Sequence, residues 1–272
     1  MGSAATMDPL NFVKYEGAGN DFLVVEASSE RAVSPERAIA LCDRHYGVGA
    51  DGVLLVVPAA DPALRARMVV LNADGSRPEM CGNGLRCVAL HLARRDALER
   101  ASYRLETDAG ERSAEVERSG SAAQITQGMG RGRLGGSTRF TVKGEEREFL
   151  LVDMGNPHAV TFGAPLTEAE LDVVGPALSA TQPHGANVEI VTPVAGRLDV
   201  LVWERGVGRT LACGTGAAGV AVAAATTGIA RFGEPVEVRL PGGSLYVTVD
   251  EKTLNATMRG PARLVFSGRV EA

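Results

Sequence analysis

The chain has 272 residues, enough for one large domain or two of ordinary size. It is 45% apolar and 22% charged, as globular proteins are, and its net charge of −5 without a basic run argues against a nucleic-acid surface. No apolar stretch approaches the roughly 20 residues of a transmembrane helix and no secretion signal is visible, so we expect a cytoplasmic protein without a membrane partner.

The first half of the chain alternates short apolar strands with two helical patterns. Residues 1–6 are interpreted as a leader or cloning remnant, with Met7 as the natural start. A helix is predicted over residues 34–46, capped by Ser34 and begun by Pro35. A second helix is predicted over residues 82–95. The predicted strands cover residues 12–14, 22–27, 53–57, 67–72, 103–107 and 112–117.

The second half follows a segment rich in glycine and serine between Ser119 and Gly136, which indicates a domain boundary. Helices are predicted over residues 166–178 and directly after Cys213. Short alternating segments near the end are expected to be antiparallel strands. The predicted strands cover residues 138–143, 148–153, 158–162, 186–191, 198–204, 236–240, 244–250, 255–260 and 263–266.

One kind of turn occurs once in each half. Cys81 and Cys213 each begin a Cys-Gly-Xaa-Gly turn, and a run of small apolar residues that predicts a helix follows each turn. A helix start presents unpaired N–H groups and a positive dipole end, so we expect it to hold an anion and to lower the pKa of the thiol. The other cysteines, Cys42 and Cys87, fall inside helical patterns and are expected to be buried. All four are expected to be free thiols, because no CxxC pair occurs.

Each half therefore predicts a mostly antiparallel sheet wrapped around one helix, whose small residues let the sheet approach closely. The expected fold class is α+β, with two pseudo-symmetric domains and the active site in the cleft between them. Residues 1–123 with 259–272 would form the half that carries Cys81. Residues 124–258 would form the half that carries Cys213.

Two facing thiols suit the inversion of a carbon centre. One thiolate removes a proton from one face, and the other thiol returns a proton to the opposite face. The two helix starts would hold the carboxylate on that carbon and stabilise the charge that develops as the C–H bond breaks. Such a reaction needs no cofactor and no metal, and we expect none.

Other reaction classes explain less of the sequence. None of the three lysines lies in a glycine-rich site suited to pyridoxal phosphate, and the four histidines are scattered, unlike zinc ligands. Residues 47–52 match GxGxxG but follow a helix and precede a strand, the reverse of a dinucleotide site. A Cys-His acyl-transfer enzyme that uses Cys81 or Cys213 with His158 is the main rival, yet it leaves the second turn unexplained. A non-catalytic binding module explains neither turn.

Taken together, the motifs resemble those of diaminopimelate epimerases. The resemblance implies a cofactor-independent isomerase that interconverts LL- and meso-diaminopimelate in lysine and peptidoglycan precursor biosynthesis. The matching segments come in the family's order and span almost the whole chain. They are GAGNDF at residues 17–22, GVGADG at 47–52, NADGS at 72–76, MCGNG at 80–84, GNPH at 155–158, NVE at 187–189, ERGVG at 204–208 and ACGTG at 212–216.

The resemblance also implies roles for several of the matching residues. Cys81 and Cys213 would be the catalytic acid/base pair, and His158 and Glu204 would tune the two thiols. The groups that hold the reacting carboxylate would be those of Gly82, Asn83, Gly214 and Thr215. Amides and a guanidinium suit a distal carboxylate, and a glutamate suits a distal ammonium. The remaining substrate-binding residues would be Asn20, Asn72, Asn156, Asn187, Glu204 and Arg205.

Two positions depart from the family pattern. Arg209 stands where the family usually has an acidic residue, which leaves the substrate range open. Gly52 stands where some members carry a polar contact to substrate, so we assign it no binding role. Proline racemases and hydroxyproline epimerases share the fold and the paired cysteines and are the alternative, although their motifs resemble MCGH and DRSPCGTG. The resemblance also implies a homodimer, with Phe266 as a candidate contact and a core position as its competing interpretation.

Overall fold

The structure is a computed structural model that describes residues 9–271, so the interpretation of residues 1–6 and Met7 lies outside it. The chain divides into two compact units. One unit ends at Ile125 and resumes at Pro261, and the other is Thr126–Gly260. The expected boundaries, after residues 123 and 258, lie two residues earlier. The chain passes between the units within two strands, β7 (Ala122–Arg131) and β16 (Asn255–Val270).

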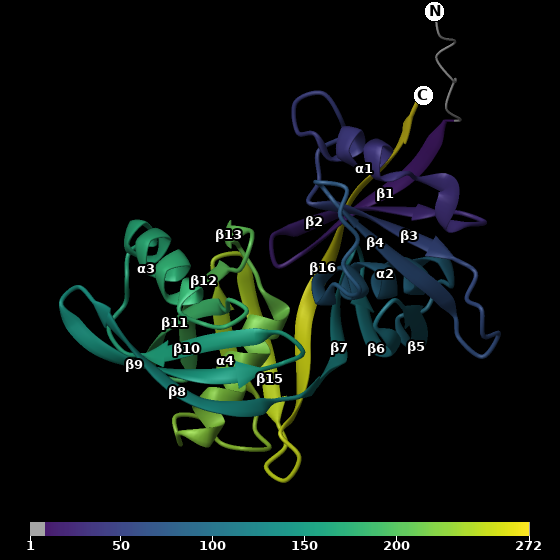
Figure 1. Ribbon diagram of the computed structural model, residues 1–272. Helices are drawn as coiled ribbons and strands as arrows, with labels where there is room; N and C mark the ends of the chain where they lie inside the picture. Colours follow the sequence, from purple (N-terminus) through teal and green to yellow (C-terminus); the bar gives the residue numbers. More distant parts are fainter. Residues whose placement is uncertain (1–8, 272) are drawn as a thin grey trace, which may run out of the picture. The chain divides into compact units, whose positions relative to one another are not determined.

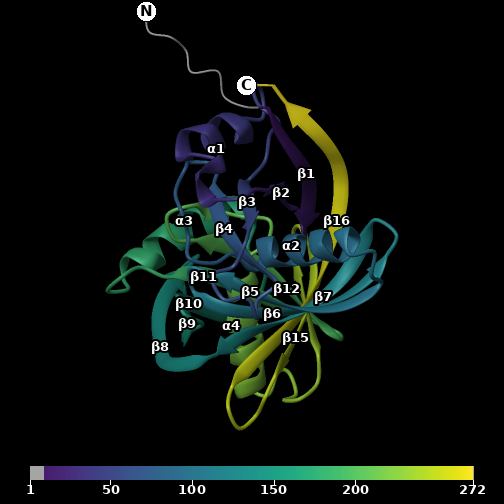
Figure 2. The same ribbon diagram turned by 90° about the vertical axis from the view of Figure 1, so that its right-hand side faces the viewer.

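The first unit wraps a sheet around helix α2 (Gly82–Arg95), which Figure 2 shows beside β1. The pairing of β1 with β16, from Leu10 opposite Val270 to Glu16 opposite Arg263, closes this sheet. The pairs β2–β3 and β4–β5 are parallel. In sheet order the strands are β1 (Leu10–Gly17), β2 (Asn20–Glu26), β3 (Gly52–Val57), β4 (Ala66–Asn72), β5 (Arg100–Thr107), β6 (Gly110–Ser119), β7 and the C-terminal part of β16.

The strands of the first unit are buried on both faces where two helices cover them. Leu54 of β3 packs in one apolar cluster with Leu85 of α2. Its neighbour Leu55 packs in another cluster with Leu41 of α1 (Pro35–Cys42). Successive side chains of a strand point to opposite faces, so α1 and α2 lie on opposite sides of β3. This is why β3 is a continuous apolar run rather than an alternating one.

The second unit repeats this plan around helix α4 (Gly214–Thr226), which contacts β9, β10, β11, β14 and β15 (Figure 1). Helix α3 (Glu168–Ala180) packs on β11 and β12, and the two-residue strand β13 (Gly208–Arg209) pairs with β12. In sheet order the strands are the N-terminal part of β16, β15 (Gly243–Val249), β14 (Val236–Leu240), β12 (Arg197–Glu204), β11 (Asn187–Val194), β10 (Pro157–Phe162), β9 (Glu145–Asp153) and β8 (Arg133–Val142).

The central helix of the second unit shows why small residues were needed. Every residue from 216 to 225 is buried, and the largest of them are valines. A Cβ added at Gly219 would lie 3.4 Å from the ring of His158 on β10. The expected α+β class, with a mostly antiparallel sheet around one helix in each unit, is confirmed.

Several local predictions were wrong. The helix predicted to reach residue 46 ends at Cys42, because the Asp43 carboxylate accepts the N–H groups of His45 and Tyr46 and turns the chain. One strand, β16, replaces the two strands predicted after residue 254. Strand β7, which was not predicted, lies in the segment that indicated a domain boundary. Phe266 is 43% exposed and lies edge-on to Phe12, so its interpretation as a core aromatic was also wrong.

The expectation for the cysteines that do not begin a turn is confirmed. Cys42 and Cys87 are buried, and all four cysteines are free. Among the described residues, no helix is long and apolar enough to cross a membrane.

The packing of α3 predicts an unusual response to a glycine substitution. Alanine normally stabilises a helix interior by about 1 kcal/mol relative to glycine. A Cβ added at Gly175, however, would lie 2.4 Å from Cγ of Trp203 on β12. We therefore expect Gly175→Ala to lower the free energy of unfolding by about 1–3 kcal/mol, measured by urea denaturation. Gly128→Ala is the control, because its Cβ would meet nothing within 4 Å. A Gly175→Ala protein as stable as the wild type would contradict this packing.

Candidate active site

The two cysteines that begin the predicted turns are N-cap residues of α2 and α4. Cys81 Sγ accepts a hydrogen bond from the N–H of Gly84 at 3.4 Å. Cys213 Sγ accepts one from the N–H of Gly216 at 3.3 Å. In each case sulfur takes the place of the oxygen that usually caps a helix, and the donated N–H favours the thiolate.

The second glycine of each turn is required by close packing. A Cβ added at Gly84 would lie 2.9 Å from Leu54 Cδ2, in the sheet that surrounds α2. A Cβ added at Gly216 would lie 2.8 Å from Glu189 Oε1 and 3.2 Å from Cys213 Sγ. A larger residue at either position would push the helix start away from the strands. The glycines therefore fix where each thiol lies within its own unit.

In the first unit, the start of α2 brings two of the expected binding residues together. Gly82 begins the helix, and the buried Asn83 follows it. Asn83 Nδ2 donates to Asn20 Oδ1 at 3.1 Å. Asn20 lies at the first position of β2, so this bond joins a strand to the helix that Cys81 caps.

Asn72 lies at the end of β4, in the turn that begins the loop to Cys81. Its Nδ2 donates to Ser76 Oγ at 2.9 Å, and its backbone N–H donates to Ser76 O at 2.8 Å. The turn is closed by the N–H of Gly75, which donates to Asn72 O at 2.9 Å. Asn72 thus shapes the loop whose last residue is Cys81.

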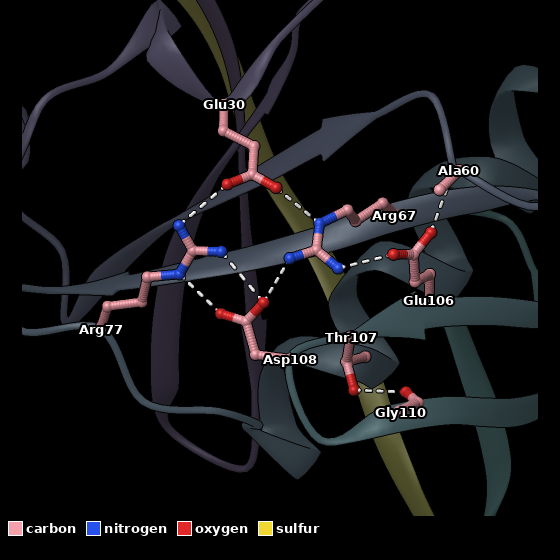
Figure 3. A network of polar contacts seen from close by, with 8 residues as sticks. All are labelled: Glu30, Ala60, Arg67, Arg77, Glu106, Thr107, Asp108 and Gly110. Atoms are coloured by element: carbon pink, nitrogen blue, oxygen red, sulfur yellow. Dashed lines mark hydrogen bonds and ion pairs between the residues drawn. The ribbon is translucent and has the colours of Figure 1, made fainter.

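An ion-pair network holds the same loop against the sheet (Figure 3). Arg77, in the loop, pairs with Asp108 at 2.6 Å and with Glu30 at 2.9 Å. Arg67 of β4 contacts both of these carboxylates and also Glu106, at 2.8 Å. Isolated surface ion pairs contribute little, but here Arg77 binds Asp108 through two nitrogens and shares Asp108 and Glu30 with Arg67 in one network. The network therefore restrains the loop that leads to Cys81.

In the second unit, a buried pair lies behind the start of α4. His158 Nδ1 and Glu189 Oε1 are 2.6 Å apart, and neither side chain is exposed. His158 Nε2 lies 3.1 Å from Asn156 Oδ1, so two of the predicted site residues are joined. Within the described part of the chain, Glu189 Oε2 has no hydrogen-bond partner. Glu189 was not predicted as a site residue, although a glutamate within the apolar strand NVEIV is a sequence signal for one.

A second carboxylate adjoins Cys213. Glu204, at the end of β12, accepts a hydrogen bond from Thr210 Oγ1 at 2.5 Å and is also hydrogen-bonded to Cys213. Burial raises the pKa of the Glu204 carboxyl, and these two bonds offset part of that rise. Thr210 is another contact that the sequence analysis did not find.

The pKa of the Cys213 thiol corrects an expectation. Burial raises this pKa well above its usual value, and the nearby carboxylates of Glu204 and Glu189 raise it further. The helix-start prediction had the opposite sign. Its cause is present, because Gly216 donates to the sulfur and Thr215 Oγ1 lies 3.6 Å from it, but burial and negative charge outweigh both. Cys213 is therefore a protonated thiol at neutral pH.

The remaining predicted residues of the second unit meet at the end of β12. Asn187 Oδ1 accepts the backbone N–H of Arg205 at 2.8 Å, so a buried amide fixes this part of the chain. The Arg205 guanidinium donates to the carbonyl oxygen of His184. Gly214 is the first residue of α4. Arg209, the departure from the family pattern, pairs with Glu168 and Asp172 on α3.

The structure thus assembles the predicted residues in two groups. The group around Cys81 contains Asn20, Asn72, Gly82 and Asn83. The group around Cys213 contains Asn156, His158, Asn187, Glu204, Arg205, Gly214 and Thr215. Among residues 9–271, no three His, Cys, Asp or Glu side chains are arranged to hold a metal ion.

Because negative charge helps to keep Cys213 protonated, Glu204→Gln should lower the pKa of its thiol. Alkylation of Cys213 by iodoacetamide should then reach its half-maximal rate at lower pH, as followed by mass spectrometry of the Cys213 peptide. Glu168→Gln is the control, since it removes the same charge from an exposed position on α3. A Glu204→Gln curve that stays in place or moves to higher pH would contradict this electrostatic assignment.

Comparison with known proteins finds one matching family model and similar proteins that cover nearly the whole chain. The family model described as diaminopimelate epimerase matches residues 12–134 and 150–265. The diaminopimelate epimerase of Desulforudis audaxviator is 42% identical over 278 residues, covering 96% of this chain and 99% of that protein. The chloroplastic diaminopimelate epimerase of Oryza sativa subsp. japonica is 39% identical over 287 residues, covering 95% and 79%.

Solved structures share the fold at lower identity. A phenazine biosynthesis protein of the PhzF family from Bacillus anthracis has a TM-score of 0.75 at 18% identity, covering 98% of this chain and 100% of that one. A hydroxyproline epimerase from Agrobacterium vitis has a TM-score of 0.71 at 16% identity, covering 98% and 92%. At such identities only the fold is shown, whereas the family model and the relatives near 40% identity decide membership. The chain belongs to the diaminopimelate epimerase family, as its motifs predicted.

Proposed function

We propose that the protein is an isomerase that interconverts LL- and meso-diaminopimelate by a two-thiol acid/base reaction, without metal or organic cofactor. The observation that carries the mechanism is the matched pair of N-cap cysteines, each with its sulfur bonded to the second glycine of a CGxG turn. Membership in the diaminopimelate epimerase family supports the substrate. The product would serve lysine and peptidoglycan precursor synthesis.

The proton balance follows from the surroundings of the two thiols. In one direction the Cys81 thiolate takes the Cα proton, the electron pair of the C–H bond stays on the carbon and its carboxylate, and the Cys213 thiol delivers a proton to the opposite face. The raised pKa of Cys213 supports its starting as the protonated partner. Cys81 interacts with the buried guanidinium of Arg86, and that positive charge favours its thiolate. The reverse direction exchanges the two roles.

Glu204 and His158 would tune the thiols. Glu204 is hydrogen-bonded to Cys213, so its charge acts directly on this thiol. His158 acts less directly, because its two ring nitrogens lie against Glu189 and Asn156. We propose that this pair holds Asn156 in place for the substrate.

The reacting carboxylate would lie at the helix starts, at Gly82 and Asn83 in one unit and at Gly214 and Thr215 in the other. A helix start favours an anion through its N–H groups and dipole. The far end of the substrate would contact the amides of Asn72, Asn156 and Asn187, together with Glu204 and Arg205. An amide–guanidinium set suits the distal carboxylate, and Glu204 suits the distal ammonium.

The Cys-His acyl-transfer rival is less consistent with this geometry. It requires a histidine whose ring nitrogen can take a proton from a thiol. Both ring nitrogens of His158 face other partners, at 2.6 and 3.1 Å. A proline-type racemase would use the same paired thiols, so assays with proline, hydroxyproline and diaminopimelate are needed to separate the two substrate classes.

We further propose that the protein acts as a cytoplasmic homodimer, in line with its family resemblance. Phe266 of β16 is a candidate contact because it is 43% exposed although it lies against Phe12. Sedimentation equilibrium of the wild type and of Phe266→Ser tests this contact, since the variant should shift the equilibrium toward the monomer.

Isotope exchange tests the two-thiol reaction. In D₂O, LL-diaminopimelate should yield the meso isomer with deuterium at the inverted Cα, while unreacted LL isomer stays largely protiated early on. The reason is that different thiols remove and deliver the proton. Cys81→Ser and Cys213→Ser should each lower kcat by about 100- to 10,000-fold. Cys42→Ala, on α1, is the control and should retain activity. Early deuterium in recovered LL isomer would favour a single base.

The distal assignment predicts a selective effect of Arg205. Arg205→Met should raise KM for diaminopimelate about tenfold or more, because a charge-assisted bond to the distal carboxylate is lost. Arg197→Met is the matched control, because Arg197 begins β12, the strand that Arg205 directly follows, and pairs with Asp199 instead. KM is measured by a coupled assay at one fixed pH. Equal KM values for the wild type and Arg205→Met would show that Arg205 does not contact the substrate.

A further inference from the structure

The GxGxxG-like segment at residues 47–52, set aside as a nucleotide motif, contributes a carboxylate to the Cys81 group. Asp51 Oδ2 accepts Nδ2 of Asn20 at 2.7 Å and the backbone N–H of Asp21 at 3.0 Å. Asp51 Oδ1 accepts Nη2 of Arg44 at 2.7 Å. None of the roles implied by the family resemblance uses Asp51. Its bond to Asn20 therefore needs an explanation of its own.

At the other side of the same amides lies Arg86, a fully buried cation on α2. Its Nη2 donates to Asn83 Oδ1 at 2.8 Å, and its Nε donates to Pro261 O at 3.0 Å. Among the described residues, its Nη1 has no hydrogen-bond partner. A buried guanidinium bonded to neutral oxygens is costly. Its bond to Asn83 places this buried positive charge beside a residue that lies two residues from Cys81 along the chain.

The two charged groups fix the orientation of both amides. An amide can be turned over with little change in shape, so its partners decide which end is oxygen. An ionised carboxylate only accepts hydrogen bonds, so Asn20 must present nitrogen to Asp51 and oxygen to Asn83. A guanidinium only donates, so Asn83 must present oxygen to Arg86 and nitrogen to Asn20. Both requirements make Asn83 the donor and Asn20 the acceptor between the two amides, and the 3.1 Å bond from Asn83 Nδ2 to Asn20 Oδ1 has this direction.

Turning over either amide would break this agreement. A reversed Asn20 would set its oxygen against the Asp51 carboxylate, and a reversed Asn83 would set its NH₂ group against Arg86. The backbone leaves little slack, because a Cβ added at Gly17 would lie 3.3 Å from Arg86 Nη2 and 3.4 Å from Pro261 O. Both amide oxygens are thus engaged by donors of the protein. Each amide nitrogen donates one hydrogen within this set, to Asp51 or to Asn20, and an NH₂ group carries a second hydrogen that an anion can accept.

We propose that Asp51 and Arg86 are positioning residues that hold the Asn20 and Asn83 amides with their nitrogens toward the substrate carboxylate beside Cys81. The identity of that carboxylate rests on the proposed function. The orientation of the amides does not, since it follows from the four side chains alone. The N-terminus of α2 would then bind a carboxylate through N–H donors. Asp51 and Arg86 would hold the two amide donors in the orientation that this requires.

Asp51→Asn tests the proposal, since it keeps the size of the side chain but lets it donate as well as accept. We expect the side-chain amide NMR signals of Asn20 and Asn83 to move in the ligand-free protein. We also expect kcat/KM for diaminopimelate to fall about 10- to 100-fold, because misplaced binding groups carry such penalties. Asp43→Asn is the matched control: the Asp43 carboxylate lies in the turn after α1, where it accepts the backbone N–H groups of His45 and Tyr46. It should move those signals far less.

A second pair of variants tests the other end. Arg86→Lys keeps a buried donor for Asn83 and should keep the Asn83 signal closer to its wild-type position than Arg86→Gln, which can present either oxygen or nitrogen. If Arg86→Gln fails to fold, the Asp51 and Arg86→Lys arms still decide the matter.

The outcomes separate this proposal from the proposed function. Unmoved amide signals in Asp51→Asn, or equal movement in Asp43→Asn, would overturn it, and so would moved signals with unchanged kcat/KM. Moved signals together with the expected loss of kcat/KM would support it. A wild-type protein that does not epimerise diaminopimelate would defeat the proposed function, and the amide signals would still show whether Asp51 and Arg86 set the orientation.

Discussion

The hydrogen bond from a helix N–H to a cysteine sulfur is the constraint on which both sites depend. It requires a glycine three residues after the cysteine, because a Cβ at Gly84 or Gly216 would collide with the surrounding sheet or with Glu189. In the second unit the sheet can come that close because α4 presents only small side chains over its buried run at residues 216–225. In each unit, the close packing at the helix start therefore determines where the thiol lies.

The two helix starts are alike in backbone but opposite in their electrostatic surroundings. Near Cys213 lie the carboxylates of Glu204 and Glu189, and the thiol is buried, so its proton is held. Near Cys81 lies the guanidinium of Arg86. In the two-thiol reaction proposed above, this difference would favour one cysteine as the thiolate and the other as the protonated thiol. The similar backbone gives both cysteines the same position at a helix start, and the different charged neighbours give the two thiols different surroundings.

The sequence was sufficient for features that depend on local patterns. The range of α2 was predicted from its turn and small residues, and the strands of both halves from their alternation. Features that depend on distant partners were missed. Strand β7 was not predicted, because its pairing with β16 is not visible in its own glycine-rich sequence, and Asp51 gains its role only from Asn20. The pKa of Cys213 was assigned the wrong direction because a helix start is visible in sequence, whereas burial and the carboxylate of Glu189 are not.

Arg209 shows how a departure from a family motif can be absorbed by the fold. An arginine in place of an acidic residue could add a cation to the substrate site, which would change the charge that the site prefers. Here its guanidinium pairs with Glu168 and Asp172, two carboxylates of α3. The same strand pair, β12 and β13, leads from Glu204 to the loop that carries Cys213. The reversed charge therefore ties this loop to α3, and the carboxylate of Glu204, hydrogen-bonded to Thr210 and Cys213, remains the charge next to the thiol.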